Sequence, residues 1–200
     1  MPPNARTLPE VLDQAVGSAT INNTQGNPYV VDLNYRGFTA SPVLGTPQGL
    51  SVFLDGMRVN EPFGDIVSWD LIPQIAIANV TMVPGSNPVF GLNTLGGAVA
   101  INTKSGFAFP GGDAKVTLGS FGRRSFDAEQ GGHRDHLDYY VATSIYNDRG
   151  WAAYNPNSIR QFFGKFGYQS DRADLDLTLM YADNLMRSAR AATRSKTTAS

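Results

Sequence analysis

The sequence lacks cysteine altogether, which excludes disulfide bonds and thiolate metal sites. Charged residues are also scarce: they make up 16% of the 200 residues, and the formal net charge is -1. This balance argues against a nucleic-acid-binding surface and against a disordered chain. No apolar run approaches the roughly 20 residues of a membrane-spanning helix, and the first ten residues lack the apolar core of a secretion signal. We therefore expect no nucleic-acid partner and no helical membrane protein.

Glycine, proline and aromatic residues are abundant instead. The 21 Gly, 12 Pro, 8 Tyr and 11 Phe are typical of many short strands joined by turns. They are most concentrated in residues 80–104, where an alternating apolar run leads into a turn-rich centre and alternation then resumes. We expect a strand, a compact glycine-rich loop and a second strand there. Glycines at this density indicate backbone that turns sharply or packs closely.

The glycine-rich loop does not carry the groups that phosphate binding needs. Gly91 and Gly96 have the spacing of a phosphate-binding loop, but Gly97 and Ala98 stand where a Lys and a Ser or Thr are required. The sequence also has no nucleophile elbow, no H-E-x-x-H motif and no paired carboxylates in a recognisable context. We therefore predict a protein that is not an enzyme and that has no catalytic residues, no metal site and no cofactor.

The first half of the chain predicts a small α+β domain with a mixed sheet. A helix is expected from the N-cap Thr7 to near Gly17, because the apolar residues between them recur at amphipathic spacing. A short helix interrupted by Pro73 is expected at residues 71–77. The strands expected before the glycine-rich loop are residues 30–38, 50–54, 57–59 and 77–83.

Two features of this domain point to a turn and to a binding loop. Asp55-Gly56 lies between two apolar runs and is a strong signal for a two-residue hairpin. Loops on a rigid scaffold commonly carry binding residues. The loop of residues 60–69 contains Phe63 and Trp69, whose side chains would offer aromatic surface. We therefore take these two residues as candidates for ligand contact.

Beyond residue 105 the pattern changes to segments of about ten residues that alternate strictly between polar turns. The clearest is residues 173–181, where one face carries Leu175, Leu177, Leu179 and Tyr181. Such alternation is expected of antiparallel strands in a transmembrane β-barrel, which need roughly 9–11 residues each. A soluble β-sandwich also has one buried face, so it stays open as an alternative. A barrel wide enough to hold a separate domain needs more strands than residues 106–200 supply, so we expect a truncated barrel.

Five motifs follow one another along the first 126 residues. In chain order they are LPEVLDQAVGSATINN, LNYRGF, SVFLDGMRVN, IANVTMVPGSNPVFGLNTLGGAVAINTK and LGSFGRRSF. Taken together, they resemble the TonB-dependent outer-membrane receptors. The resemblance implies a plug domain at residues 1–105 and the first part of an outer-membrane β-barrel at residues 106–200. In this family the plug lies inside a barrel of about 22 strands.

The resemblance implies active transport of a scarce ligand across the Gram-negative outer membrane, with the plug gating the barrel. The partners would be a ferric siderophore or similar small ligand, the TonB energy-coupling complex and outer-membrane lipid, and the location would be the cell outer membrane. The segment that TonB grips is not recognisable before Thr7, so we expect it to lie upstream of residue 1. A soluble or surface β-rich binding or adhesion module is the alternative.

The resemblance also implies roles for particular residues. Arg36-Gly37 matches a plug motif whose arginine meets acidic groups of the barrel. A guanidinium suits this contact because it can form two parallel hydrogen bonds with a carboxylate. The alternative is that Arg36 is a solvent-facing charge at a strand end. Asp55-Gly56 matches the family's hairpin. The glycines assigned to the closing plug motif are Gly85, Gly91, Gly96 and Gly97. Val83 stands where the family usually has a second arginine, which leaves Arg36 as the main candidate for anchoring the plug.

Overall fold

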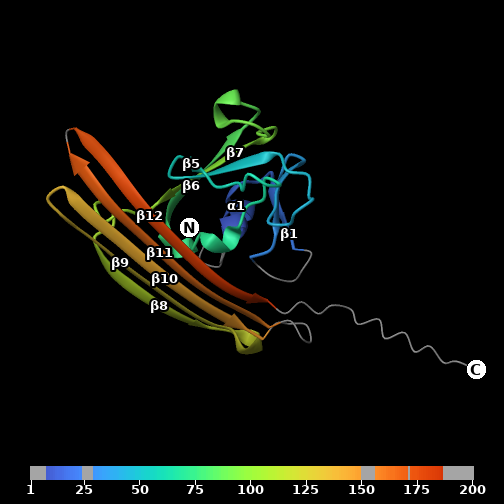
Figure 1. The fold of residues 1–200 in the computed structure, drawn as a ribbon. Coiled ribbons are helices and arrows are strands. Elements are labelled where there is room, and N and C mark those ends of the chain that lie inside the picture. The colour runs from blue at the N-terminus through green and yellow to red at the C-terminus, as the bar shows by residue number, and fades with distance from the viewer. Residues whose placement is uncertain (1–7, 24–28, 150–155, 171, 187–200) are drawn as a thin grey trace, which may run out of the picture.

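The computed structural model describes residues 8–23, 29–149, 156–170 and 172–186. Within these residues the chain forms three β-sheets. A helix and the two smaller sheets build an N-terminal domain, and a curved antiparallel sheet from the C-terminal half lies against it (Figure 1). The expected N-cap, Thr7, lies outside the described residues.

The helix α1, Leu8–Ala15, confirms the helix expected from the amphipathic spacing. Its apolar face, which includes Leu8 and Leu12, is buried. A three-stranded antiparallel sheet follows, with the strands β1 (Ala19–Asn22), β2 (Asp32–Tyr35) and β3 (Phe38–Ala40) in that order. The sequence pattern predicts neither β1 nor β3 as a separate strand, because each is too short to show a period of two.

The second small sheet has the strand order β5-β4-β7-β6. Its strands are β4 (Leu50–Leu54), β5 (Met57–Arg58), β6 (Ile77–Pro84) and β7 (Gly97–Thr103). β7 pairs in parallel with β4 and antiparallel with β6, so the expected strand, loop and strand of the glycine-rich stretch are confirmed. The helix expected at residues 71–77 is instead two 3-10 turns, η1 (Trp69–Leu71) and η2 (Gln74–Ala76), separated at Pro73. A third turn, η3 (Pro88–Phe90), lies in the loop between β6 and β7.

One buried apolar cluster joins α1 to both small sheets. It includes Leu12 of α1, Leu33 of β2 and Ile101 of β7. Full burial of each such side chain contributes about 1.5–3 kcal/mol relative to exposure. Trp69 also belongs to this cluster, and its indole N–H donates a hydrogen bond to the Val31 carbonyl at 3.2 Å. The core of the N-terminal domain therefore lies between the helix and the two sheets.

The curved sheet is an antiparallel meander in which each strand pairs with the next one along the chain. Its strands are β8 (Gly111–Leu118), β9 (Arg124–Arg134), β10 (Leu137–Asp148), β11 (Asn157–Ser170) and β12 (Ala173–Met186). The turn η4 (Ser120–Gly122) joins β8 to β9. In the described residues β8 and β12 each have a single neighbour, so the sheet is open.

The two faces of the curved sheet differ in polarity. On β10, Tyr140 and Ser144 are buried toward the N-terminal domain, whereas Tyr139 and Ile145 are exposed on the opposite face. Further exposed apolar side chains include Phe126, Phe162, Phe166, Leu177 and Leu179. A soluble sandwich buries its apolar face against a second sheet. An apolar face left exposed, with polar residues among those buried on the other face, is instead the pattern of membrane barrel strands.

No helix among the described residues is long and apolar enough to cross a membrane.

Candidate functional site at the domain interface

Lys165 of β11 forms an ionic contact between the curved sheet and the N-terminal domain. Its Nζ lies 3.2 Å from Asp55 Oδ2 in the N-terminal domain and 3.1 Å from Asp176 Oδ2 on β12. The Lys165 residue is only 7% exposed, whereas the Asp176 side chain is about half exposed. A buried ammonium between two carboxylates is well paired, and removal of the lysine would leave the Asp55 carboxylate without a cation.

Asp55 combines this contact with the hairpin role that the sequence predicts. The backbone φ is +47° at Asp55 and +82° at Gly56, which are the two positive values that a type I′ hairpin turn requires. The Asp55 carboxylate also accepts hydrogen bonds from Thr103 of β7, at 2.8 Å from the backbone N–H and 2.5 Å from the hydroxyl. The hairpin is thus fixed to the end of β7 and to β11 by one side chain.

A second polar group crosses the interface at Glu129 of β9. The Glu129 carboxylate lies 2.6 Å from Lys104 Nζ and forms a short hydrogen bond with the Tyr140 hydroxyl. The same hydroxyl lies 3.1 Å from the Ile75 carbonyl oxygen in η2. Because Lys104 and Ile75 belong to the N-terminal domain and Glu129 and Tyr140 to the sheet, this group connects the two.

A third set of contacts surrounds Asp70 of η1. Its backbone carbonyl accepts a hydrogen bond from the Gln161 side chain, and its carboxylate lies 3.4 Å from the Asn184 side-chain nitrogen. The rings of Tyr29 and Tyr146 also meet edge to face, with centroids 6.2 Å apart. These contacts place β11 and β12 against η1 and place β10 against Tyr29.

The contacts described above are mostly polar and charged. Polar groups can exchange protein partners for water, so an interface built from them separates with a smaller net loss than an apolar core. Apolar contacts accompany them, since Ala76 clusters with Tyr140 and Phe163 and Tyr29 clusters with Ile159, so the interface is mixed in character.

Two different structural features explain why the four positions assigned to the closing motif favour glycine. Gly85 and Gly91 have φ values of +91° and +83°, a region that favours glycine. Gly96 and Gly97 are close-packed: a Cβ at Gly96 would collide with the Phe38 side chain, and a Cβ at Gly97 would lie 2.5 Å from the Val83 carbonyl oxygen. Both close neighbours belong to the N-terminal domain, not to the curved sheet.

Arg36 and Gly37 form the turn between β2 and β3, with φ values of +50° and +86°. Arg36 is exposed, and its guanidinium carbon lies 5.2 Å from the centre of the Tyr35 ring. In the described part of the chain Arg36 forms no ion pair, so the ionic contacts seen at the interface come from Lys165 and Lys104. Sequence reasoning missed these two lysines. For Lys165, the sequence did contain a signal: the lysine alternates with most of the aromatic residues of its strand and therefore lies on the opposite face from them.

The two aromatic residues proposed for ligand contact lie in different environments. Phe63 is 78% exposed, as expected. Trp69 is 1% exposed and belongs to the core of the N-terminal domain, so the expectation that it offers aromatic surface is wrong. Trp69 is the first residue of η1, and its indole packs inward against Val31, which sequence alone does not reveal.

A further polar group lies beside η4. The Arg123 Nε donates to the Tyr146 hydroxyl at 3.2 Å, and Arg123 Nη2 lies 3.4 Å from Asp148 Oδ2. Burial alone would lower the pKa of the Arg123 guanidinium, but its bonds to Tyr146 and Asp148 outweigh burial and hold this pKa above its ordinary value. Arg123 therefore stays charged and fixes the turn to β10.

Residues 2–98 match the TonB-dependent Receptor Plug Domain family. No curated protein matches the chain. Among solved structures, the chain is similar to the pyoverdine outer membrane receptor FpvA from Pseudomonas aeruginosa PAO1, with 14% identity, a TM-score of 0.68 and coverage of 90% of this chain and 25% of that chain. It is also similar to the ferric citrate transporter FecA, with 17% identity and a TM-score of 0.69; the match covers 92% of this chain and 30% of the FecA chain. The copper transporter OprC gives 13% identity, a TM-score of 0.70 and coverage of 92% and 29%.

The fold and the family match agree. The chain contains a plug domain of the TonB-dependent receptor family, followed by antiparallel strands that resemble the start of the barrel of these receptors. The chain spans about a quarter of the length of the FpvA structure. We refer below to the N-terminal domain as the plug and to β8–β12 as the barrel sheet.

Proposed function

We propose that the chain is the gating part of a receptor that carries a scarce ligand across the outer membrane by TonB-dependent active transport. In this proposal residues 1–105 are the plug and residues 106–200 begin a barrel in contact with outer-membrane lipid. The observation that supports it best is the two-faced barrel sheet, which buries both polar and apolar side chains toward the plug and exposes a row of large apolar side chains on the other side. A plug held by polar contacts inside a lipid-facing wall is the arrangement that gating requires.

In this mechanism, force transmitted by the TonB complex displaces the plug relative to the barrel wall. The contacts that must then break or rearrange include Lys165 with Asp55 and Tyr140 with Ile75. Each can be replaced by hydration, so the transition does not require exposure of the plug's apolar core. Arg36 is proposed to anchor the plug to barrel strands other than β8–β12, because its exposed guanidinium is available for a bidentate pair with a carboxylate.

The ligand class that we propose is a ferric siderophore or a similar metal chelate. Two of the similar structures are named as a pyoverdine receptor and a ferric citrate transporter, whereas a third is named as a copper transporter. Phe63 is our candidate for a ligand contact in the plug, since it is highly exposed on a loop of a rigid scaffold.

Uptake measurements with the full-length gene test this function. We expect a deletion strain to lose uptake of one labelled ferric chelate from a panel, and the intact gene to restore it in a TonB-positive background only. Uptake that persists without TonB, or a deletion without effect on any chelate or other scarce nutrient, would overturn the proposal. A Phe63→Ala variant should weaken ligand binding while the receptor still reaches the outer membrane.

A further inference from the structure

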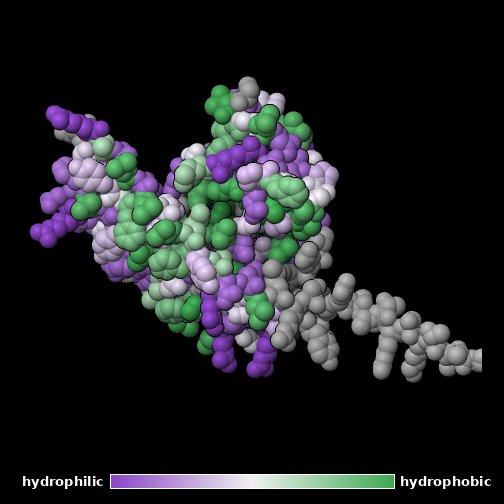
Figure 2. Space-filling model, in the orientation of Figure 1, coloured by the Kyte–Doolittle hydropathy of each residue, from purple (hydrophilic) through white to green (hydrophobic). Residues whose placement is uncertain are grey.

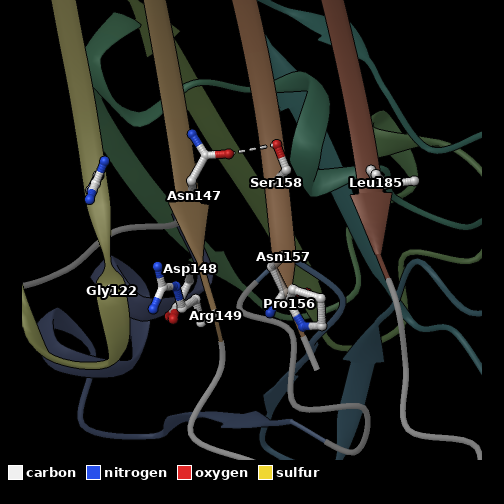
Figure 3. Close-up of a pocket in the computed structure, with 9 residues that line it drawn as sticks. Gly122, Asn147, Asp148, Arg149, Pro156, Asn157, Ser158 and Leu185 are labelled. Carbon is white, nitrogen blue, oxygen red and sulfur yellow. Dashed lines mark hydrogen bonds between the residues drawn. The ribbon is translucent and has the colours of Figure 1, made fainter. Parts of the chain in front are cut away.

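A polar cavity lies at the η4 end of the barrel sheet, and four of its lining residues face away from the plug. Arg124, Asn147, Ser158 and Leu185 are neighbours in register across four strands, so their side chains share one face. That face is the exposed one, because Phe126 and Ile145 lie two residues further along the same strands and are exposed. The Ser158 hydroxyl donates to the Asn147 side-chain oxygen at 2.8 Å, which fixes both groups (Figure 3).

The cavity has a volume of about 410 Å³ and is open to one side. Besides the four residues above, Gly122, Asp148, Arg149, Pro156 and Asn157 line it. The Arg149 side chain lies close over the backbone of η4: a Cβ at Gly122 would be only 3.0 Å from Arg149 Cδ. The absence of a side chain at Gly122 therefore lets Arg149 approach the cavity from the strand end (Figure 3).

Positive charge predominates in this cavity. Arg124 and Arg149 take part in none of the ion pairs formed within the described residues. Asp148, the acidic lining residue, is already bound by Arg123 at 3.4 Å and by the Tyr146 hydroxyl at 2.8 Å. The two arginines are thus available for an external anion.

An apolar band adjoins the cavity on the same face of the sheet. It begins two rows further along the strands, with the exposed side chains of Phe162 and Tyr181, and continues through Phe166, Leu177 and Leu179. Figure 2 shows hydrophobic side chains over the middle of the barrel sheet and hydrophilic ones toward its ends. Between the cavity and this band, one register row holds Phe126, Ile145, Arg160 and Asp183, and the formal charges of its arginine and aspartate cancel. The cavity therefore lies where an apolar surface gives way to uncompensated positive charge.

We propose that this cavity binds the phosphate of an anionic lipid headgroup, with the lipid's acyl chains lying over the adjoining apolar band. The guanidinium groups of Arg124 and Arg149 would contact the phosphate oxygens, a task that their planar donors suit. Asn147 and Ser158 would add neutral hydrogen bonds. The inference rests on the proposed function, because it requires the exposed face of the barrel sheet to meet lipid. A soluble phosphate would satisfy the cavity but would leave the apolar band uncovered.

Lipid titration of the full-length receptor that contains this chain tests the inference. The purified receptor in detergent is titrated with phosphatidic acid or with phosphatidylcholine, and the first lipid bound is measured by native mass spectrometry. We expect the receptor to prefer phosphatidic acid, and Arg124→Gln and Arg149→Gln each to reduce that preference by about fivefold. Arg134→Gln is the matched control, since Arg134 occupies the same face of β9 at its other end. It should leave the preference unchanged.

Each alternative gives a different result. If Arg134→Gln reduced the preference for phosphatidic acid as much as the other two variants, general attraction to a charged surface would explain the binding. The proposed site in the cavity would then be overturned. Competition by inorganic phosphate that exceeds the effect of chloride at equal ionic strength would identify a soluble anion as the occupant. If the receptor inserts into vesicles and transports its ligand but shows no headgroup preference, this inference fails alone. If it does not insert into vesicles, the proposed function fails as well.

Discussion

At the scale of single residues, Lys165 makes the most consequential contact between plug and barrel sheet. We predict that Lys165→Met destabilises the hairpin between β4 and β5 by roughly 3 kcal/mol, because it leaves two carboxylates without their shared cation. The Thr103 amide, which donates to Asp55, should then exchange with solvent about 100-fold faster. Hydrogen exchange of the full-length receptor measures this effect.

The other partner of Lys165 provides the matched control. Asp176 is about half exposed, so Asp176→Asn should cost less than about 1 kcal/mol and leave Thr103 protected. Asp55→Asn added to Lys165→Met should recover part of the loss, since the buried charge is then removed. Unchanged exchange at Thr103 in the Lys165 variant would show that the ion pair does not hold the hairpin.

Gly97 carries the second prediction at this scale. Its φ of +149° disfavours any other residue, and a Cβ would lie 2.5 Å from the Val83 carbonyl oxygen, which is backbone and cannot rotate away. Gly97→Ala should therefore destabilise the plug by about 1–3 kcal/mol from the backbone conformation alone. Gly17→Ala is the control, since a Cβ there meets nothing within 4 Å. Urea unfolding that shows equal midpoints for the two variants would contradict this account.

At the scale of elements, the sequence predicts a helix or turn well when the residues of one short stretch determine its structure. The amphipathic spacing of α1 and the Asp55-Gly56 turn are such cases, because a helix face and a type I′ turn are set by neighbouring residues. The strands β1 and β3 are not predictable in this way. They exist because β2 pairs with both of them, and pairing is not visible in four or three residues.

The candidate site depends on contacts between distant parts of the sequence. Asp55 and Lys165 are 110 positions apart, and neither carries a local signal for the other. Trp69 shows the same limit, because it is buried in a cluster whose members are distant in sequence, and its indole donates to Val31, 38 positions away. The sequence therefore predicts which elements form and which face of a strand is apolar, but not which charges meet across the interface.

The positions of β7 and β12 in their sheets give an element-scale prediction. β7 is hydrogen-bonded on both sides, by β4 and β6, and lies in the plug core, whereas β12 pairs only with β11 in the described part of the chain. In the isolated 200-residue chain we expect the amides of β7 to exchange far more slowly than those of β12. Equal protection in both strands would show that the barrel sheet is stable without further strands.

At the scale of the whole molecule, the plug has a buried apolar core whereas the barrel sheet exposes an apolar face, and substitution by lysine tests the environment of that face. Leu179 lies near the middle of β12 on that face, so Leu179→Lys should cost about 2–4 kcal/mol if the face meets lipid. Leu175→Lys, near the strand end, should cost only about 0–1 kcal/mol. In a soluble module both changes would lie within about 0.5 kcal/mol, because both leucines are already exposed to water. Unfolding of the full-length receptor in lipid vesicles measures the difference, and equal small effects at the two positions would refute a membrane location for this face.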